Sequence, residues 1–199
     1  MPIIGIITRS SISEEGHKIN IIYDDIKSCI LNNGGIPIGI MLTENYKEII
    51  NLCDGIIFQG GDDFEKYDLD SLKYIYQINK PVLGICLGMQ LMGVLFDGNM
   101  ININNHKKKL CYAHNVIINR NSILYNIYKT NNIKVNSRHK QIIKNTKLKV
   151  VGISQDGYIE AIEDSSKKFF IGVQWHPENM ASYNKEQNNL FKYFIKQCK

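Results

Sequence analysis

The chain has 199 residues, of which 44% are hydrophobic and 22% are charged, and its formal net charge is +5. A chain of this length can bury a core without metal or disulfide support, and the composition excludes a disordered or fibrous protein. The longest apolar runs are far too short to span a membrane, so we expect no membrane segment. The first residues lack a basic n-region and run straight into a strand-like pattern, so we expect no secretory signal and a cytoplasmic location.

The pattern of charges and cysteines narrows the possible partners further. The basic residues are almost all lysines, and the arginines are Arg9, Arg120 and Arg138. No aromatic–basic interleaving and no helix-turn-helix pattern accompany them, so we expect no nucleic-acid partner. The five cysteines are scattered without C-x-x-C spacing. We therefore expect neither a disulfide framework nor a zinc site.

In the first half, apolar strand-like runs alternate with helix-length segments, and a Ser- and Gly-containing loop leads up to Gly16. Near-continuous apolar strands separated by helices indicate a parallel sheet that is covered on both faces. We predict, in chain order, a strand over Ile3–Thr8, a helix over Asn20–Asn33, a strand over Ile36–Met41, a helix over Glu44–Asn51, a strand over Asp54–Gln59, a helix over Asp70–Asn79, a strand over Pro81–Ile85 and a helix over Gly88–Phe96.

The second half begins with an Asn-rich stretch, Asn99–Lys109, which we predict to be a surface loop with a solvated Lys107–Lys109 run. Shorter strands with turns between them follow, and Asp156-Gly157 is a strong hairpin signal. The predicted elements are strands over Ala113–Asn119, Ile133–Asn136, Leu148–Ser154, Tyr158–Glu163 and Phe169–Gln174, and a final helix over Lys185–Lys196. Neither a repeat nor a long linker interrupts the chain, so we expect one α/β domain over residues 1–199.

A cysteine stands where the fourth predicted strand meets the next helix. The segment Gly84-Ile85-Cys86-Leu87-Gly88 is typical of a strand–turn–helix nucleophile elbow, in which glycines give clearance to a cramped central residue. Cys86 would project from the carboxyl end of a central strand, where the helix dipole favours a thiolate. We predict that Cys86 is a nucleophile. The alternative, on this segment alone, is a buried structural cysteine.

A histidine and a glutamate follow the last predicted strand, in Gln174-Trp175-His176-Pro177-Glu178. Glu178 can accept a hydrogen bond from one imidazole nitrogen of His176 while the other nitrogen faces a thiol. Alone, this pattern is more typical of a hydrogen-bonded structural histidine. Together with an elbow cysteine earlier in the chain, it predicts Cys-His nucleophilic catalysis.

Two glycines, Gly60 and Gly61, come directly after the third predicted strand. In a doubly wound sheet this loop opens at the same edge as Cys86, and glycines let backbone N–H groups approach a ligand closely. The N–H groups of Gly61 and Leu87 would then form a two-donor oxyanion hole. The alternative is a plain turn.

The segments Gly84-Ile85-Cys86-Leu87-Gly88-Met89-Gln90 and Gln174-Trp175-His176-Pro177-Glu178 together resemble the class I glutamine amidotransferase superfamily. This resemblance extends over essentially the whole chain. It implies a flavodoxin-like three-layer sandwich, with a mostly parallel central sheet and extra short antiparallel strands in the second half. It also implies that Cys86, His176 and Glu178 form a catalytic triad. Gly61 and Leu87 would be the oxyanion donors, and Gly60 and Gln90 would bind the substrate.

Two further segments, Val135-Asn136-Ser137-Arg138-His139-Lys140-Gln141 and Asp156-Gly157-Tyr158-Ile159-Glu160-Ala161-Ile162-Glu163, resemble the γ-glutamyl hydrolase branch. Its free-standing members remove glutamate from γ-glutamylated amines. The branch implies that Ser137 and His139 line the substrate pocket. Arg138 stands where the pattern varies, so it either reads the leaving group or forms a surface ion pair.

The resemblance implies a small γ-glutamylated substrate and no obligatory synthase partner. We expect no metal and no organic cofactor, because backbone dipoles polarise the carbonyl. The leaving group stays open. One candidate is nucleotide-linked, as in γ-glutamyl-CDP-amidate of capsule phosphoramidate synthesis, with which the cationic balance of the chain is compatible. Another is an amine such as γ-aminobutyrate, from γ-glutamyl-γ-aminobutyrate.

Two other functions stay open as well. A glutaminase subunit that feeds ammonia to a partner synthase would carry the same triad, and assays on glutamine and on γ-glutamylated amines separate it from a hydrolase. A binding or regulatory module of the same fold would have lost catalysis, and the intact Cys86, His176 and Glu178 argue against it.

Overall fold

The computed structural model describes residues 1–104, 106–108 and 110–198. Up to Leu95, strands and helices follow one another as β1 (Ile3–Ile7), β2 (Arg9–Ile12), β3 (Lys18–Ile21), α1 (Asp24–Asn32), β4 (Ile36–Ile40), α2 (Tyr46–Asn51), β5 (Gly55–Phe58), α3 (Asp68–Gln77), β6 (Val82–Ile85) and α4 (Leu87–Leu95). The later elements are β7 (Asn99–Asn102), β8 (His114–Ile118), α5 (Ile123–Tyr128), β9 (Asn132–Val135), β10 (Gln141–Lys144), β11 (Lys149–Ser154), β12 (Ile159–Glu163), β13 (Phe170–Val173) and α6 (Lys185–Gln197).

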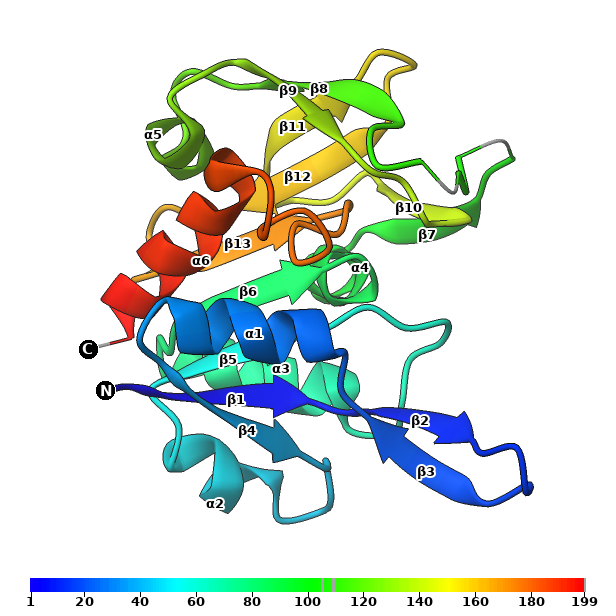
Figure 1. Ribbon diagram of the computed structural model, residues 1–199, viewed down its shortest axis with the longest axis vertical. Coiled ribbons are helices and arrows are strands. Elements are labelled where there is room, and N and C mark those ends of the chain that lie inside the picture. The colour runs from blue at the N-terminus through cyan, green and yellow to red at the C-terminus, as the bar shows by residue number, and fades with distance from the viewer. Residues whose placement is uncertain (105, 109, 199) are drawn as a thin grey trace.

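One large sheet organises the molecule (Figure 1). Its nine strands lie in the order β4-β1-β5-β6-β13-β12-β11-β8-β9. From β4 to β13 the neighbouring strands are parallel, and from β13 to β9 they are antiparallel. The predicted fold class, an α/β sandwich with short antiparallel strands added by the second half, is confirmed.

Helices cover both faces of this sheet. In Figure 1, α1 and α6 lie in front of it, and their buried side chains share one apolar cluster with those of α5. Buried side chains of α2, α3 and α4 belong to a second cluster with the other face. Burial of these faces supplies the main stabilisation of such a three-layer fold. None of the helices in the described ranges is long and apolar enough to cross a membrane.

The N-terminal loop and the first helix differ from the prediction. Residues that we expected to be loop or the start of helix Asn20–Asn33 form an antiparallel hairpin, β2–β3, and α1 begins only at Asp24. The hairpin strands pair with each other and not with the main sheet, and most of their side chains are exposed. They therefore lack the apolar run that identifies a buried strand.

The Asn-rich stretch also differs from the prediction. Within the expected loop Asn99–Lys109, residues Asn99–Asn102 form strand β7, which pairs antiparallel with the unpredicted strand β10. Asparagine is depleted in strands, so local sequence favours a loop here, but pairing with a distant segment overrides that preference. Residues 105 and 109, which belong to the predicted loop and lysine run, lie outside the described residues. Helix α5 was not predicted either.

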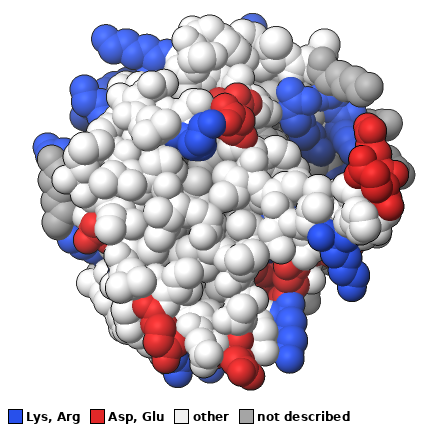
Figure 2. All heavy atoms as spheres, turned by 60° about the horizontal axis from the view of Figure 1, so that its bottom comes forward, with Lys and Arg blue, Asp and Glu red and all other residues white. Residues whose placement is uncertain are grey.

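On the face of the molecule shown in Figure 2, charged side chains do not form a single band. Figure 2 shows one face of the molecule, on which lysine, arginine and acidic side chains lie mainly around the rim while the centre is mostly uncharged. A continuous basic stripe, the usual footprint of a nucleic-acid site, is not visible on this face.

Candidate active site

Three loops that carry predicted site residues open at the same edge of the sheet. Strands β5, β6 and β13 are adjacent and parallel, so their carboxyl ends meet. Gly60 and Gly61 follow β5, Cys86 follows β6, and His176 follows β13. Parallel pairing thus brings together residues that are far apart in sequence, at the place where open α/β sheets bind ligands.

Cys86 occupies a strained turn between β6 and α4. Its φ is 53° and its ψ is −103°, a backbone conformation that costs energy for any residue with a side chain. Both neighbouring glycines are required by close packing. A Cβ at Gly84 would lie 2.5 Å from Met92 Sδ, and a Cβ at Gly88 would lie 2.1 Å from the Phe58 carbonyl oxygen. The Cys86 side chain is buried but reaches the cleft, with 7% of the residue exposed.

His176 is held from two sides. Its Nδ1 lies 2.6 Å from Glu178 Oε1, a short, charge-assisted hydrogen bond. Its backbone N–H donates to Asn136 Oδ1, and Asn136 Nδ2 donates to the His176 carbonyl, both at 2.8 Å. Burial acts to lower the pKa of His176, but the charges of Glu178 and Cys86 and hydrogen bonds to both raise it from 6.5 to about 10. The imidazole can therefore carry a proton at neutral pH and deliver it to a leaving group.

The two glycines after β5 lie directly against the other site residues. A Cβ at Gly60 would lie 2.8 Å from His176 Cε1, and a Cβ at Gly61 would lie 3.0 Å from Leu87 Cδ2. The Leu87 N–H is in the first turn of α4, where backbone N–H groups have no partner within the helix. Both predicted oxyanion donors are thus next to Cys86.

A cleft with two adjoining hollows, of about 310 and 380 Å³, opens over Cys86. The first hollow also reaches Tyr23, His176, Glu178 and Asn179, and the second reaches Gln90, His139, Lys140 and Gln141. Residues shared by both are Gly61, Asp62, Cys86, Lys107 and Arg138. A two-part substrate would fit this shape if the bond between its two parts lay beside Cys86 and each part occupied one hollow.

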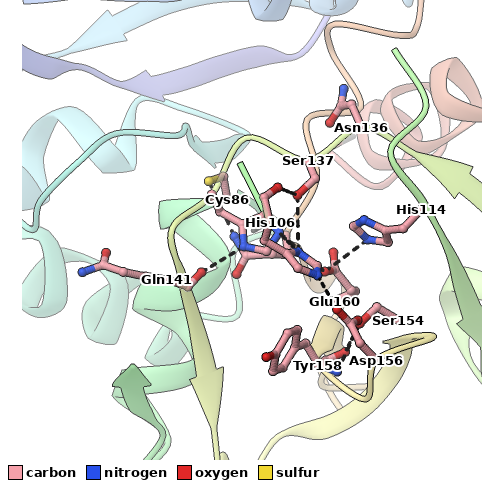
Figure 3. Close-up of polar contacts among 12 residues, drawn as sticks. Cys86, His106, His114, Asn136, Ser137, Gln141, Ser154, Asp156, Tyr158 and Glu160 are labelled. Atoms are coloured by element: carbon pink, nitrogen blue, oxygen red, sulfur yellow. Dashed lines mark hydrogen bonds and ion pairs between the residues drawn. The ribbon is translucent and has the colours of Figure 1, made fainter. Parts of the chain in front are cut away.

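The predicted substrate-binding residues are divided between the cleft and the interior. Gln90 and His139 line the second hollow, and Arg138, which donates from Nε to Asn179 at 3.1 Å, lines both. Ser137 is fully buried, and its hydroxyl donates to the carbonyl of His106 (Figure 3). The structure therefore places Ser137 beneath the cleft wall, where it supports the loop that carries His106.

Several residues of the site were not singled out from sequence. Gln174 lies next to the nucleophile, since its Nε2 is 3.6 Å from Cys86 Sγ and its Oε1 accepts from Gln90 Nε2 at 3.2 Å. Lys107, expected to be merely solvated, lines both hollows. For Gln174 and Asn136 a signal existed, because both are polar residues at the carboxyl ends of predicted strands. For Lys107 we find no local signal.

Comparison with known proteins finds relatives of this chain. The family model described as Peptidase C26 matches residues 65–178, more than half of the chain. A relative from Schizosaccharomyces pombe named "Putative glutamine amidotransferase" is 32% identical, over 85% of this chain and 79% of its own length. The GMP synthase (glutamine-hydrolyzing) of Blochmanniella floridana is 30% identical over 71% of this chain, which corresponds to 28% of the synthase.

Solved structures agree with the fold. The glutaminase domain of Trypanosoma brucei CTPS with bound acivicin has a TM-score of 0.78 and 18% identity, over 100% of this chain and 94% of that one. A glutamine amido transferase from Methylobacillus flagellatus has a TM-score of 0.74 and 12% identity, over 98% of this chain and 94% of that one. At such identity the likeness supports the flavodoxin-like architecture alone.

Proposed function

Because the chain belongs to the peptidase C26 family of class I glutamine amidotransferase-like hydrolases, we propose that it hydrolyses a γ-glutamyl amide-type bond and releases glutamate. The observation that carries this proposal is the strained elbow of Cys86 beside the His176–Glu178 hydrogen bond of 2.6 Å. A thiol, a proton-carrying imidazole and a carboxylate that orients it are the parts that acyl transfer through a thioester requires.

In the first step, the Cys86 thiolate attacks the γ-carbonyl carbon of the substrate. The oxygen of the tetrahedral intermediate becomes negatively charged, and the N–H groups of Gly61 and Leu87 donate hydrogen bonds to it. His176 gives its proton to the leaving nitrogen as the C–N bond breaks. The products of this step are a γ-glutamyl thioester on Cys86 and a free amine-type leaving group.

In the second step, neutral His176 takes a proton from water, and the resulting hydroxide attacks the thioester. Collapse of the second tetrahedral intermediate expels the Cys86 thiolate and releases glutamate. Glu178 keeps the Nδ1 proton of His176 in place throughout, which holds the imidazole in the orientation that both transfers need. We assign Gly60, Gln90 and His139 to the wall around the bound glutamyl group, and Ser137 to its support.

The residues around the cleft favour a leaving group with negative charge. Lys107 and Arg138 line both hollows, and Lys140 lines the second. In the second hollow these three cationic side chains outnumber the carboxylates of Asp62 and Asp63. In the first hollow the carboxylates are Asp62 and Glu178, and Glu178 is paired with His176. Arginine and lysine are the side chains that recognise phosphate groups. We therefore propose γ-glutamyl-CDP-amidate, an intermediate of capsule phosphoramidate synthesis, ahead of γ-glutamyl-γ-aminobutyrate, whose leaving amine carries a single carboxylate.

The experiment that tests this function is a comparison of substrates with the purified chain. Glutamate release is measured on γ-glutamyl-CDP-amidate, γ-glutamyl-γ-aminobutyrate and glutamine, in parallel with the Cys86→Ala variant. We expect the highest kcat/KM on the phosphate-bearing compound and no release by the variant. If glutamate is released fastest from γ-glutamyl-γ-aminobutyrate, the proposed leaving group is wrong, but the proposed γ-glutamyl hydrolysis still stands.

A matched pair of arginine variants tests the charge argument. Arg138→Gln should raise KM for γ-glutamyl-CDP-amidate about 10-fold or more, while KM for glutamine changes little, because a charge-assisted contact to phosphate contributes about 1.5–3 kcal/mol. Arg120→Gln is the control, since Arg120 is exposed in the turn after β8. Equal effects of Arg138→Gln on both substrates contradict a role in recognising the leaving group.

A glutaminase subunit is the second candidate function. It is favoured by the names of the synthases to which the chain is similar, a glutamine-hydrolyzing GMP synthase and CTP synthases. In that case glutamine would be the preferred substrate, and a synthase partner would stimulate its hydrolysis. Rapid hydrolysis of glutamine that requires an added synthase supports this candidate over the hydrolase.

A further inference from the structure

A second polar cluster lies beneath the cleft wall, apart from Cys86, His176 and Glu178. Its members are His106, His114, His139 and Glu160, which come from four different segments of the chain. Glu160 is fully buried, and the histidine side chains are 7%, 12% and 1% exposed, respectively. A charged carboxylate without compensation in such a place is strongly unfavourable, so it must be paired.

Hydrogen bonds do not provide that pairing. Both oxygens of Glu160 and both ring nitrogens of His114 are buried without a hydrogen-bond partner. The nearest nitrogens to Glu160 Oε1 are His114 Nε2 at 3.3 Å, His139 Nε2 at 3.5 Å and His106 Nδ1 at 3.9 Å. Charge-assisted hydrogen bonds between nitrogen and carboxylate oxygen are shorter, at about 2.7–2.9 Å.

The same separations suit ligands that share a metal ion. Nitrogen and oxygen atoms about 2.0–2.1 Å from a tetrahedral zinc ion lie roughly 3.3 Å from one another. The donor atoms of His106, His114 and Glu160 all lie within 4.8 Å of one another. His139 Nε2 faces the same point, 3.2 Å from His106 Nδ1. Figure 3 shows the rings of His106 and His114 directed toward Glu160.

Hydrogen bonds to residues outside the cluster orient the rings of His106 and His139, so that the other nitrogen of each ring faces the centre of the cluster. His106 Nε2 lies 2.8 Å from Asp156 Oδ2, and His139 Nδ1 lies 3.1 Å from the carbonyl oxygen of Gln141. Both partners are acceptors, so these two nitrogens carry hydrogens. In the neutral rings, His106 Nδ1 and His139 Nε2 then present lone pairs to each other, so either a proton or a metal ion lies between them. Such outer carboxylate and carbonyl partners are the usual support of metal-binding histidines.

We infer that His106, His114, His139 and Glu160 bind one divalent transition-metal ion of the zinc class. Three imidazoles and one carboxylate form a borderline donor set that suits zinc and disfavours magnesium or calcium, which prefer oxygen ligands. With four protein ligands the ion has a structural role. This inference departs from two expectations, that of no zinc site, which rested on cysteine spacing, and that of no metal for the reaction. The site uses no cysteine, and its ion takes no part in the reaction.

Because the cluster lies next to the cleft, a bound ion would affect the position of cleft residues. Lys107 follows His106 and Arg138 precedes His139, so each of the two cations shared by both hollows is next to a ligand. The Gln141 carbonyl that accepts from His139 also accepts from the cleft residue Gln90, at 2.8 Å. Binding of the ion would fix the loop of residue 106 and the segment of residue 138 onto β12, and so position these cations.

Metal titration of the full chain tests this site without reference to activity. Protein stripped with a chelator is titrated with Zn²⁺ by calorimetry and with Co²⁺ by absorbance, as wild type and as Cys86→Ala, because the Cys86–His176 pair offers a competing thiolate. We expect one equivalent to bind in both proteins. The Co²⁺ spectrum should show ligation by nitrogen and oxygen without a thiolate charge-transfer band.

Matched variants locate the ion. In the Cys86→Ala background, Glu160→Gln and His114→Asn should each weaken Zn²⁺ binding about 100-fold or more, since each removes a direct ligand. His17→Asn, in the exposed turn of the β2–β3 hairpin, should leave it unchanged. Zn²⁺ should raise the thermal unfolding midpoint of the His17→Asn protein and not that of Glu160→Gln.

Each of the following outcomes overturns the inference. The first is the absence of stoichiometric Zn²⁺ or Co²⁺ binding, which would mean that the cluster holds only a proton. The others are loss of binding in Cys86→Ala and equal binding by Glu160→Gln and the wild-type cluster. If the cluster variants do not fold, the Co²⁺ spectrum of the wild-type protein alone decides whether the ion is bound by the cluster or by Cys86. A thiolate band there places the metal at Cys86 and refutes the site.

Discussion

At the scale of single residues, the proposed chemistry depends on the position of one proton. Glu178 Oε1 lies 2.6 Å from His176 Nδ1, and the amide of Asn136 holds the backbone of His176 at both its N–H and its carbonyl. The imidazole therefore has little freedom to rotate. Its remaining nitrogen, Nε2, is the one left to exchange a proton with the thiol and the substrate.

Replacement of Glu178 by glutamine should lower kcat roughly 10²–10⁴-fold with little change in KM, because the amide no longer favours the charged imidazole. Glutamate release by the purified variant measures this effect. Glu186→Gln, in the exposed first turn of α6, is the control and should keep wild-type kcat. Full activity in Glu178→Gln would remove Glu178 from the triad.

The pH dependence of stability reports on the same proton. The pKa of His176 is raised from 6.5 to about 10, so the folded protein binds this proton more tightly than the unfolded chain does. Its stabilising contribution is complete below pH 6.5 and is lost as the pH rises to about 10. The difference in free energy of unfolding between wild type and Glu178→Gln should therefore narrow over this range. A difference that stays constant would contradict the raised pKa.

Sequence alone predicted some of the residues around Cys86, but it missed Gln174 and Lys107 and did not predict how all of them act. Cys86, His176 and Glu178 were found because each follows a predicted strand, and parallel strands end at one edge. Ser137 was assigned to the substrate, whereas it is buried and donates to the carbonyl of His106. Which way a side chain in a loop points depends on packing between segments that are distant in sequence, and no local pattern encodes it.

At the scale of elements, the elbow between β6 and α4 is the feature most strictly required by packing. Strand β6 lies between β5 and β13, and α4 packs closely enough on β5 that Gly88 touches the backbone of Phe58. No side chain fits in that space. The short distance brings the first turn of α4, with its unpaired N–H groups, to the edge of the sheet.

Gly88→Ala should lower the free energy of unfolding by about 3 kcal/mol or prevent folding, because its Cβ would lie 2.1 Å from a backbone oxygen that cannot move aside. Gly16→Ala is the control. Its Cβ would meet nothing within 4 Å, so only the positive φ of 83° costs energy, about 1 kcal/mol. Denaturant unfolding of both variants measures the contrast, and equal effects would contradict this account of the elbow.

The strands that could be predicted from sequence are the buried ones. Strands β1, β5 and β6 were predicted because nearly all of their residues are buried and apolar. The β2–β3 hairpin and the β7–β10 pair were not predicted, because their strands have exposed or polar residues and are stabilised by pairing with each other. Strand propensity depends on such context more than helix propensity does.

At the scale of the whole molecule, the sheet brings distant residues to two neighbouring places. The parallel half assembles the cleft around Cys86 at the ends of β5, β6 and β13. The antiparallel half, with the loops before β8 and before β10, assembles the cluster around Glu160. Lys107 and Arg138 lie between the two places, so the proposed leaving-group site and the proposed metal site share the same loops.

The central claim is that Cys86 forms the acyl-enzyme. It is tested most directly by rapid quenching of the purified chain with γ-glutamyl-CDP-amidate or glutamine, followed by intact-protein mass measurement and glutamate assay. Cys111→Ala, which removes an exposed cysteine, is the matched control for Cys86→Ala. We predict a γ-glutamyl adduct and glutamate release in wild type and Cys111→Ala, and neither in Cys86→Ala. Undiminished glutamate release by Cys86→Ala would contradict the account.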